Sequence, residues 1–168
     1  GKIYRKGFKQ FRQEIAASLA ALDYSCDPKA HAKSEQLRAM DICAEAICVF
    51  ARRHARLARE MAERAECDGN CARAAELSRI AEICSWVPEN PPRDFWEALQ
   101  AYWFVHLGVI TELNTWDSFN PGRLDQHLYP FYKQGLESGT LTEESARELL
   151  QCLWIKFNNQ PAPPKVGV

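Results

Sequence analysis

The 168-residue sequence predicts a mainly α-helical chain, because apolar side chains recur every three or four positions along most of its length. No stretch shows the strict alternation of apolar and polar residues that is typical of a half-buried strand. The segment 95–110 is apolar on every side at about 100° per residue, and such a helix is buried inside a larger body. It is too short, and too often interrupted by polar residues, to cross a bilayer.

Turn-forming residues separate the expected helices. Asp68-Gly69-Asn70 and the proline-rich connector 87–92 each end a helical pattern. Gly135 and Gly139 are expected to form a turn, and Thr142 with two following glutamates suits the cap of the last helix. The expected helices cover about 2–22, 30–66, 71–86, 93–111, 122–134 and 142–157.

The longest expected helix carries a heptad-like row in which alanines would allow a second helix to approach closely. This predicted row consists of Leu37, Met40, Ala44, Ile47, Ala51, His54, Ala58, Met61 and Ala65. His54 is therefore interpreted as a core histidine with a satisfied hydrogen bond. The arginines between positions 52 and 64 alternate with Glu60 and Glu63, which indicates a solvated, salt-bridged face and not an anion site.

Composition excludes several classes of protein. A net charge of −1 gives no electrostatic reason to expect nucleic acid or an anionic membrane as partner. No apolar run follows the basic N-terminal residues, so no signal peptide is predicted. The seven cysteines lie mostly within helical patterns and are interpreted as reduced, buried, small hydrophobic side chains in a cytoplasmic or anaerobic setting. Cys67 and Cys71 lack two further ligands at matching spacing, so no metal site is predicted.

No phosphate-binding loop, nucleophile elbow or zinc-protease helix motif occurs in the sequence. Cys43 and Glu45 would face apart on a helix, and the geometry of Glu112, Asp117 and Asp125 is left open. Neither end of the chain carries a helix cap, which suggests a fragment. The residues alone therefore indicate the helical part of a larger cytoplasmic protein, with polar loops at 112–121 and 158–165.

Three blocks in order, at 95–107, 121–132 and 149–159, resemble the glycyl radical enzymes of the pyruvate formate-lyase superfamily. The segments 112–119 and 157–168 are most similar to the choline trimethylamine-lyase group, with isethionate sulfite-lyases as the neighbouring candidates. The resemblance implies a ten-stranded α/β barrel wrapped in helices. This chain would be an N-terminal helical portion of that barrel.

The resemblance also implies radical chemistry. A glycyl radical, installed by a partner S-adenosylmethionine iron–sulfur activase, passes to a cysteine whose thiyl radical abstracts hydrogen from the substrate. The expected reaction is cleavage of choline to trimethylamine and acetaldehyde, with isethionate cleavage or glycerol or diol dehydration as alternatives. The family's Gly-Cys-x-Glu and Arg-Val-x-Gly-Tyr loops do not occur in these 168 residues. No catalytic residue is therefore assigned, and the chain alone is expected to bind no cofactor and to be inactive.

Candidate pocket residues come from the same resemblance. Asp117 and Ser118 occupy the place of a His-Ser pair that reaches substrate in glycerol-dehydrating relatives, with a purely structural loop as the alternative. Asn158, Asn159 and Gln160 are weaker candidates, because amides commonly brace the backbone. The implied assembly is a homodimer in the cytoplasm or in a bacterial microcompartment. A non-catalytic helical interaction module and a cysteine-based metal or redox protein are the competing functions.

Overall fold

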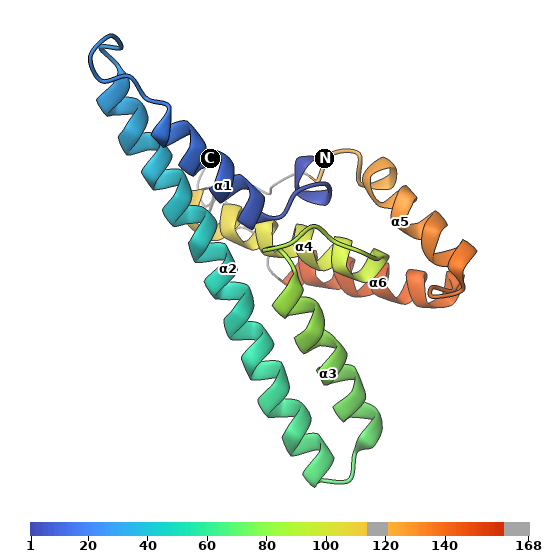
Figure 1. The fold of residues 1–168 in the computed structure, drawn as a ribbon. Coiled ribbons are helices and arrows are strands. Elements are labelled where there is room, and N and C mark those ends of the chain that lie inside the picture. The colour runs from blue at the N-terminus through green and yellow to red at the C-terminus, as the bar shows by residue number, and fades with distance from the viewer. Residues whose placement is uncertain (114–120, 160–168) are drawn as a thin grey trace, which may run out of the picture. The chain divides into compact units, whose positions relative to one another are not determined.

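The structure is a computed structural model that describes residues 1–113 and 121–159 (Figure 1). Every regular element in these ranges is a helix, which confirms the mainly α prediction. The elements are η1 (Lys2–Tyr4), α1 (Phe8–Ala20), α2 (Ala30–Cys67), α3 (Cys71–Trp86), α4 (Phe95–Gly108), the π-helical turn η2 (Val109–Leu113), α5 (Leu124–Ser138) and α6 (Glu143–Asn159). None of these helices is long and apolar enough to span a membrane.

The chain divides into two compact units, which are described separately. Residues 2–91 form the hairpin unit, in which α3 returns alongside α2 and α1 lies against the N-terminal half of α2 (Figure 1). The return is made at the predicted turn, where Gly69 has a φ of +75° that favours glycine. Asn70 then caps α3, because its side chain accepts a hydrogen bond from the Arg73 N–H at 3.2 Å.

The α2 seam has the predicted period, but only three of its nine predicted positions are buried. The shared members are Ala44, Ala51 and Ala58, whereas His54 is exposed and is not a core histidine. The other buried positions of α2 also carry small side chains and not the large apolar ones that were predicted. Larger side chains of α3, such as Leu77 and Ile83, are buried as well, and the close approach of α3 leaves room only for small side chains on α2. The buried residues of α2 are Ala30, Ser34, Ala44, Cys48, Ala51, Ala55, Ala58 and Ala62.

The expected helix 2–22 is interrupted at Gly7, which is buried and begins α1 as its N-cap. Its backbone presses against the connector: an added Cβ would lie 2.1 Å from the carbonyl oxygen of Glu89. The first amides of α1 donate to that connector, Phe8 to the Pro88 carbonyl at 2.9 Å and Lys9 to the Glu89 carbonyl at 3.0 Å. The connector thus satisfies α1 amides that have no partner inside the helix.

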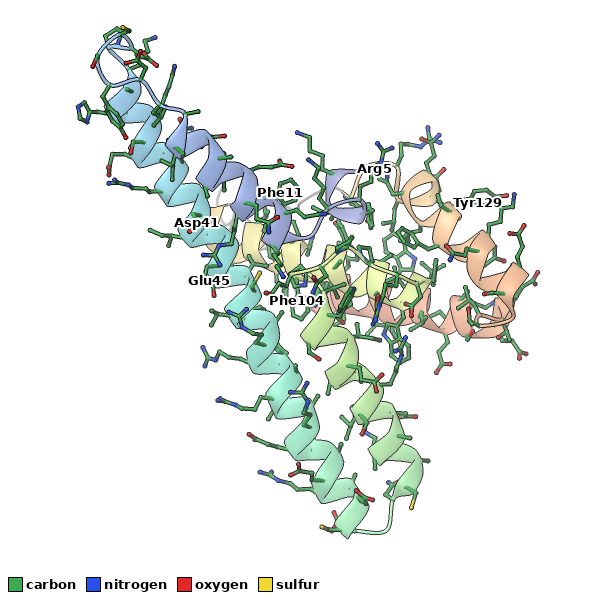
Figure 2. The ribbon with its side chains drawn as sticks, in the orientation of Figure 1. Arg5, Phe11, Asp41, Glu45, Phe104 and Tyr129 are labelled. Carbon is green, nitrogen blue, oxygen red and sulfur yellow. The ribbon has the colours of Figure 1, made fainter. Side chains whose placement is uncertain are left out.

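Charged side chains tie α1 to α2 within the hairpin unit. Arg12 of α1 lies 2.7 Å from Asp41 and also pairs with Glu45, the two carboxylates labelled on α2 in Figure 2. Arg52 continues the network, at 2.5 Å from Glu45 and 2.9 Å from Glu89. The salt-bridged interpretation of the arginine cluster is therefore confirmed at Arg52. These pairs are partly solvated, so each contributes little to stability on its own.

Residues 92–168 form the α4 unit, in which α4 contacts both α5 and α6. The turn predicted at Gly135 is wrong, because α5 continues through it to Ser138. Gly135 is buried, and an added Cβ would lie 2.7 Å from the Leu141 side chain, so glycine is required here for space. Gly139 does end the helix, with a φ of +71°. The Thr142 hydroxyl accepts from the Ser145 N–H at 3.1 Å, as expected of the cap.

Candidate functional site

The central helix of the α4 unit is held at its start by a buried carboxylate. Asp94 caps α4 by accepting the Glu97 N–H at 2.8 Å. Glu97 itself is fully buried and receives the Arg93 backbone N–H at 2.7 Å and the Arg93 guanidinium at 2.5 Å. Carboxylates at a helix N-terminus are favoured by the helix dipole. The arrangement fixes the direction in which α4 runs toward its far end.

Glu97→Gln is expected to lower the free energy of unfolding of the α4 unit by about 2 kcal/mol. The amide keeps the shape of the side chain but turns an NH₂ group toward the Arg93 donors. Arg93 is half-exposed, so water solvates its freed charge and limits the loss. Urea unfolding followed by circular dichroism measures the change, with Glu144→Gln in the exposed first turn of α6 as the matched control. Equal midpoints for the two variants would refute a stabilising role for the buried pair.

The far end of α4 carries an aromatic cluster that joins it to α6. His106 is buried, and its Nδ1 lies 3.2 Å from the Tyr102 hydroxyl. Its ring stacks on Trp103 with centroids 5.1 Å apart and meets the edge of Phe157 at 4.6 Å. Phe157 also contacts Tyr102 and Trp103, with centroid separations of 6.2 and 5.6 Å. The cluster therefore fixes the last turns of α4 and α6 side by side.

The two segments that hold the candidate residues follow η2 and Phe157 of α6 in sequence. Beyond α4 the helix widens into η2, where the Thr111 hydroxyl donates to the Leu107 carbonyl at 2.6 Å. Such local bonds compete with the regular backbone ladder, and π-helical turns are frequent at functional sites. The loop with Asp117 and Ser118 follows η2, and the segment from Asn158 follows Phe157. The described part of the chain thus ends at Leu113 before the first segment and at Asn159 within the second, and the aromatic cluster holds α4 against α6 ahead of both.

Burial lowers the pKa of His106 below its usual value, because the charged imidazolium loses hydration. The unfolded chain therefore binds more protons than the folded chain below a pH of about 6.5. The stability that His106 contributes is complete above that pH and is lost as the pH falls through the folded pKa. We expect unfolding midpoints in urea to fall between pH 7.5 and 5.5. His106→Gln should flatten this dependence, whereas the exposed, non-titrating control Gln13→Ala should leave it unchanged.

The predicted site residues have different outcomes. Asp117, Ser118 and Gln160 lie outside the described residues, so their role as pocket residues stays a prediction. The backbone of Asn159 ends α6, but its side chain also lies outside the described part. Asn158 is exposed on the last turn of α6, next to Phe157.

Asp125, one of three carboxylates whose geometry the sequence left open, is held by its neighbour Arg123. Their side chains pair through two contacts, at 3.2 and 3.1 Å. This hydrogen bonding keeps the pKa of Asp125 below its usual value. A carboxylate already held in its charged form by an arginine is poorly suited to act as a general base. Asp125 is therefore assigned a local structural role at the start of α5.

The residues described offer no set of three or more histidine, cysteine or acidic side chains that would hold a metal ion. The expected burial of the cysteines is confirmed at Cys48 and Cys84 and is wrong for the other five, which are exposed. Desolvation raises the pKa of the Cys48 and Cys84 thiols to about 11, so both are inert. A groove of about 370 Å³ lies in the hairpin unit between α1 and α2. Arg12 and Asp41 line it, and they neutralise each other across it. This groove accordingly has a structural character.

Two residues of the site went unrecognised in the sequence, where Glu97 and His106 were only polar interruptions of an apolar helix. A usable signal exists for each. Arg93 precedes Glu97 by four positions and Tyr102 precedes His106 by four, which puts each pair on one helix face. A polar residue inside an otherwise apolar helix, with a partner four positions earlier, is a satisfied buried group.

Comparison with known proteins assigns the chain to a family. The profile described as Pyruvate formate lyase-like matches residues 1–168. The chain therefore belongs to this family of glycyl radical enzymes, and its helices are the helical portion of the family's α/β barrel fold, as the resemblance implied. It is 51% identical over 166 residues to trans-4-hydroxy-L-proline dehydratase of Clostridioides difficile, which covers 99% of this chain and 21% of that protein.

Solved structures agree with the sequence matches. The crystal structure of hydroxyproline dehydratase from Clostridioides difficile, with trans-4-hydroxy-L-proline bound, matches with a TM-score of 0.91 at 50% identity, covering 98% of this chain and 20% of that one. A glycyl radical enzyme from Archaeoglobus fulgidus matches with a TM-score of 0.83 at 36% identity, covering 93% and 19%. An isethionate sulfite-lyase of Oleidesulfovibrio alaskensis is 42% identical over 154 residues, covering 92% and 18%. The chain thus spans about a fifth of the length of these relatives.

Proposed function

We propose that this chain is part of a longer glycyl radical lyase that cleaves a carbon–heteroatom bond, and that it dehydrates a hydroxylated proline or a close analogue. The supporting observation is the 51% identity to trans-4-hydroxy-L-proline dehydratase across 99% of the chain. The radical would reside on a glycine of the longer protein and would be installed by an S-adenosylmethionine iron–sulfur activase. A homodimer in the cytoplasm or a bacterial microcompartment is the proposed setting.

In this proposal, Asp117 and Ser118 line the substrate pocket together with the segment from Asn158 to Gln160. The aromatic cluster supports this grouping, because Phe157 holds α6 against α4, one segment follows η2, which continues α4, and the other follows Phe157 in sequence. Carboxylate, hydroxyl and amide side chains can orient a small polar substrate through hydrogen bonds. The thiyl chemistry itself would come from residues outside these 168.

The substrate is tested by comparing the turnover of four candidate compounds, each supplied separately. The longer protein, activated anaerobically by its activase, is incubated in turn with trans-4-hydroxy-L-proline, isethionate, choline and glycerol. Dehydration gives a product lighter by one water, isethionate cleavage releases sulfite, and choline cleavage releases trimethylamine. We expect turnover of trans-4-hydroxy-L-proline. The two relatives described above are named for hydroxyproline and for isethionate, and neither is named for choline. Release of trimethylamine would therefore overturn the dehydratase proposal and restore choline as the expected substrate.

The pocket residues are tested in the same assay. Asp117→Ala and Ser118→Ala are each expected to reduce kcat/KM by roughly tenfold to hundredfold, because loss of a positioning contact misaligns the substrate. Glu143→Gln, at the exposed start of α6, is the matched control and should retain activity. Unchanged kinetics in both pocket variants would assign these residues to a structural loop. Absence of turnover on all four substrates would favour the non-catalytic interaction module.

A further inference from the structure

A second heptad row of side chains runs along α2, separate from the buried alanine seam. Steps of three and four residues place its members on one face of the helix. We call this row the outer stripe; it consists of Cys43, Ile47, Phe50, His54, Leu57 and Met61. Its large apolar side chains are solvent-accessible in this structure, with 37% of Phe50, 51% of Leu57 and 40% of Met61 exposed.

The exposed sides of α1 and α3 in the hairpin unit are mainly polar. The exposed side of α3 carries Arg73 and Glu76, which pair at 2.8 Å, and the exposed side of α1 carries Gln13 and Glu14. The outer stripe differs because apolar residues also flank it in the N-terminal half of α2, where Met40 is 53% exposed. A contiguous exposed apolar surface beside polar ones marks a face that another element covers.

The charged residues at the edge of the outer stripe indicate which charge the covering element carries. Arg53 and Arg64 lie along one edge, and neither forms an ion pair within the residues that the structure describes. Glu60 lies on the same edge but pairs with Arg56 at 3.8 Å, so the unpaired charge of this edge is basic. An element with acidic side chains at this edge would complement them. A second copy of the chain packed antiparallel through the same stripe would instead bring the two basic edges together. Charge therefore favours a different segment as the occupant.

Chain length indicates where that segment comes from. The chain spans 21% of the hydroxyproline dehydratase and 18% of the isethionate sulfite-lyase, so about four fifths of each relative lies outside the matched region. We propose that the outer stripe docks an amphipathic segment of the longer polypeptide, apolar on one face and acidic along the edge that meets Arg53 and Arg64. This inference depends on the longer parent protein of the proposed function, but not on its substrate.

Cys43 reports on the outer stripe directly, because it is an exposed member of the row in this structure. In the longer protein, the docked segment should shield its thiol from N-ethylmaleimide. Leu57→Glu places a charge in the stripe about four turns away on α2. Leu57 is 51% exposed in this structure, so the hairpin unit itself can accept the charge. We expect Leu57→Glu to accelerate Cys43 labelling by roughly tenfold or more. Ala72→Glu on the exposed face of α3 is the matched control and should leave the rate unchanged.

Peptide mass spectrometry after timed labelling separates the outcomes. Cys43 labelled as fast in the wild-type longer protein as in Leu57→Glu would overturn the proposal, because nothing would then cover the stripe. Protection of Cys43 that disappears on dilution would also overturn it, in favour of a second copy as occupant. Charge reversal in Arg53→Glu should likewise accelerate labelling, which tests the acidic edge. The readout needs no turnover, so protection of Cys43 in a protein inactive on every substrate would refute the proposed function alone.

Discussion

Gly7→Ala is expected to lower the free energy of unfolding of the hairpin unit by about 3 kcal/mol, since overpacking against fixed atoms is among the costlier substitutions. The added Cβ would lie 2.1 Å from the Glu89 carbonyl oxygen and 2.4 Å from the Asn90 Cα. These are backbone atoms, which cannot rotate away as a flexible side chain would. The connector would have to shift, and the hydrogen bonds from Phe8 and Lys9 would be lost or weakened.

The effect is steric and not conformational. Gly7 has a φ of −81° and a ψ of 166°, which any residue adopts without strain. Substitution to alanine elsewhere in α1 provides the matched control, and exposed Gln13→Ala should change stability by less than about 0.5 kcal/mol. Urea unfolding followed by circular dichroism compares the two variants. Equal urea midpoints for Gly7→Ala and Gln13→Ala would show that the connector moves aside without lowering the free energy of unfolding.

The helical architecture could be predicted because periodicity and turn residues act locally. The α2–α3 turn follows from Asp68-Gly69-Asn70, and the last helix follows from its Thr142 cap, without reference to the rest of the chain. The break at Gly7 and the continuation of α5 through Gly135 could not be predicted in this way. Each depends on atoms distant in sequence or in the following turn, namely Glu89 and Leu141, which demand a residue without a Cβ.

The α2 seam illustrates a second limit of sequence reasoning. Two heptad rows share this helix, and hydrophobicity ranks the row with Phe50, Leu57 and Met61 above the row of alanines. In the structure the alanine row is the buried one, because the close approach of α3 requires small side chains on α2. His54 consequently lies with the outer stripe and not in the core. The candidate loops could be located as polar segments, whereas the packing of α6 on α4 ahead of them depends on the tertiary contacts of Phe157.

Phe157→Ala is expected to lower the free energy of unfolding of the α4 unit by about 2–3 kcal/mol, below the full cost for a buried phenylalanine because the ring is half-buried. The substitution removes the ring that His106, Trp103 and Tyr102 all contact. The last turn of α6 then loses its attachment to α4. Trp103 fluorescence should shift toward longer wavelength as its surroundings become more polar.

Trp154→Ala is the matched control, because Trp154 touches Phe157 at 5.5 Å from the same helix but is 56% exposed. It should cost less than about 1 kcal/mol. In the activated longer protein, Phe157→Ala should also reduce kcat/KM by roughly tenfold or more, because displacement of either candidate loop misplaces the substrate. A variant that loses stability but keeps full kcat/KM would separate the aromatic cluster from the pocket. Loss of both would link the α4–α6 junction to catalysis through the two segments that follow η2 and Phe157 in sequence.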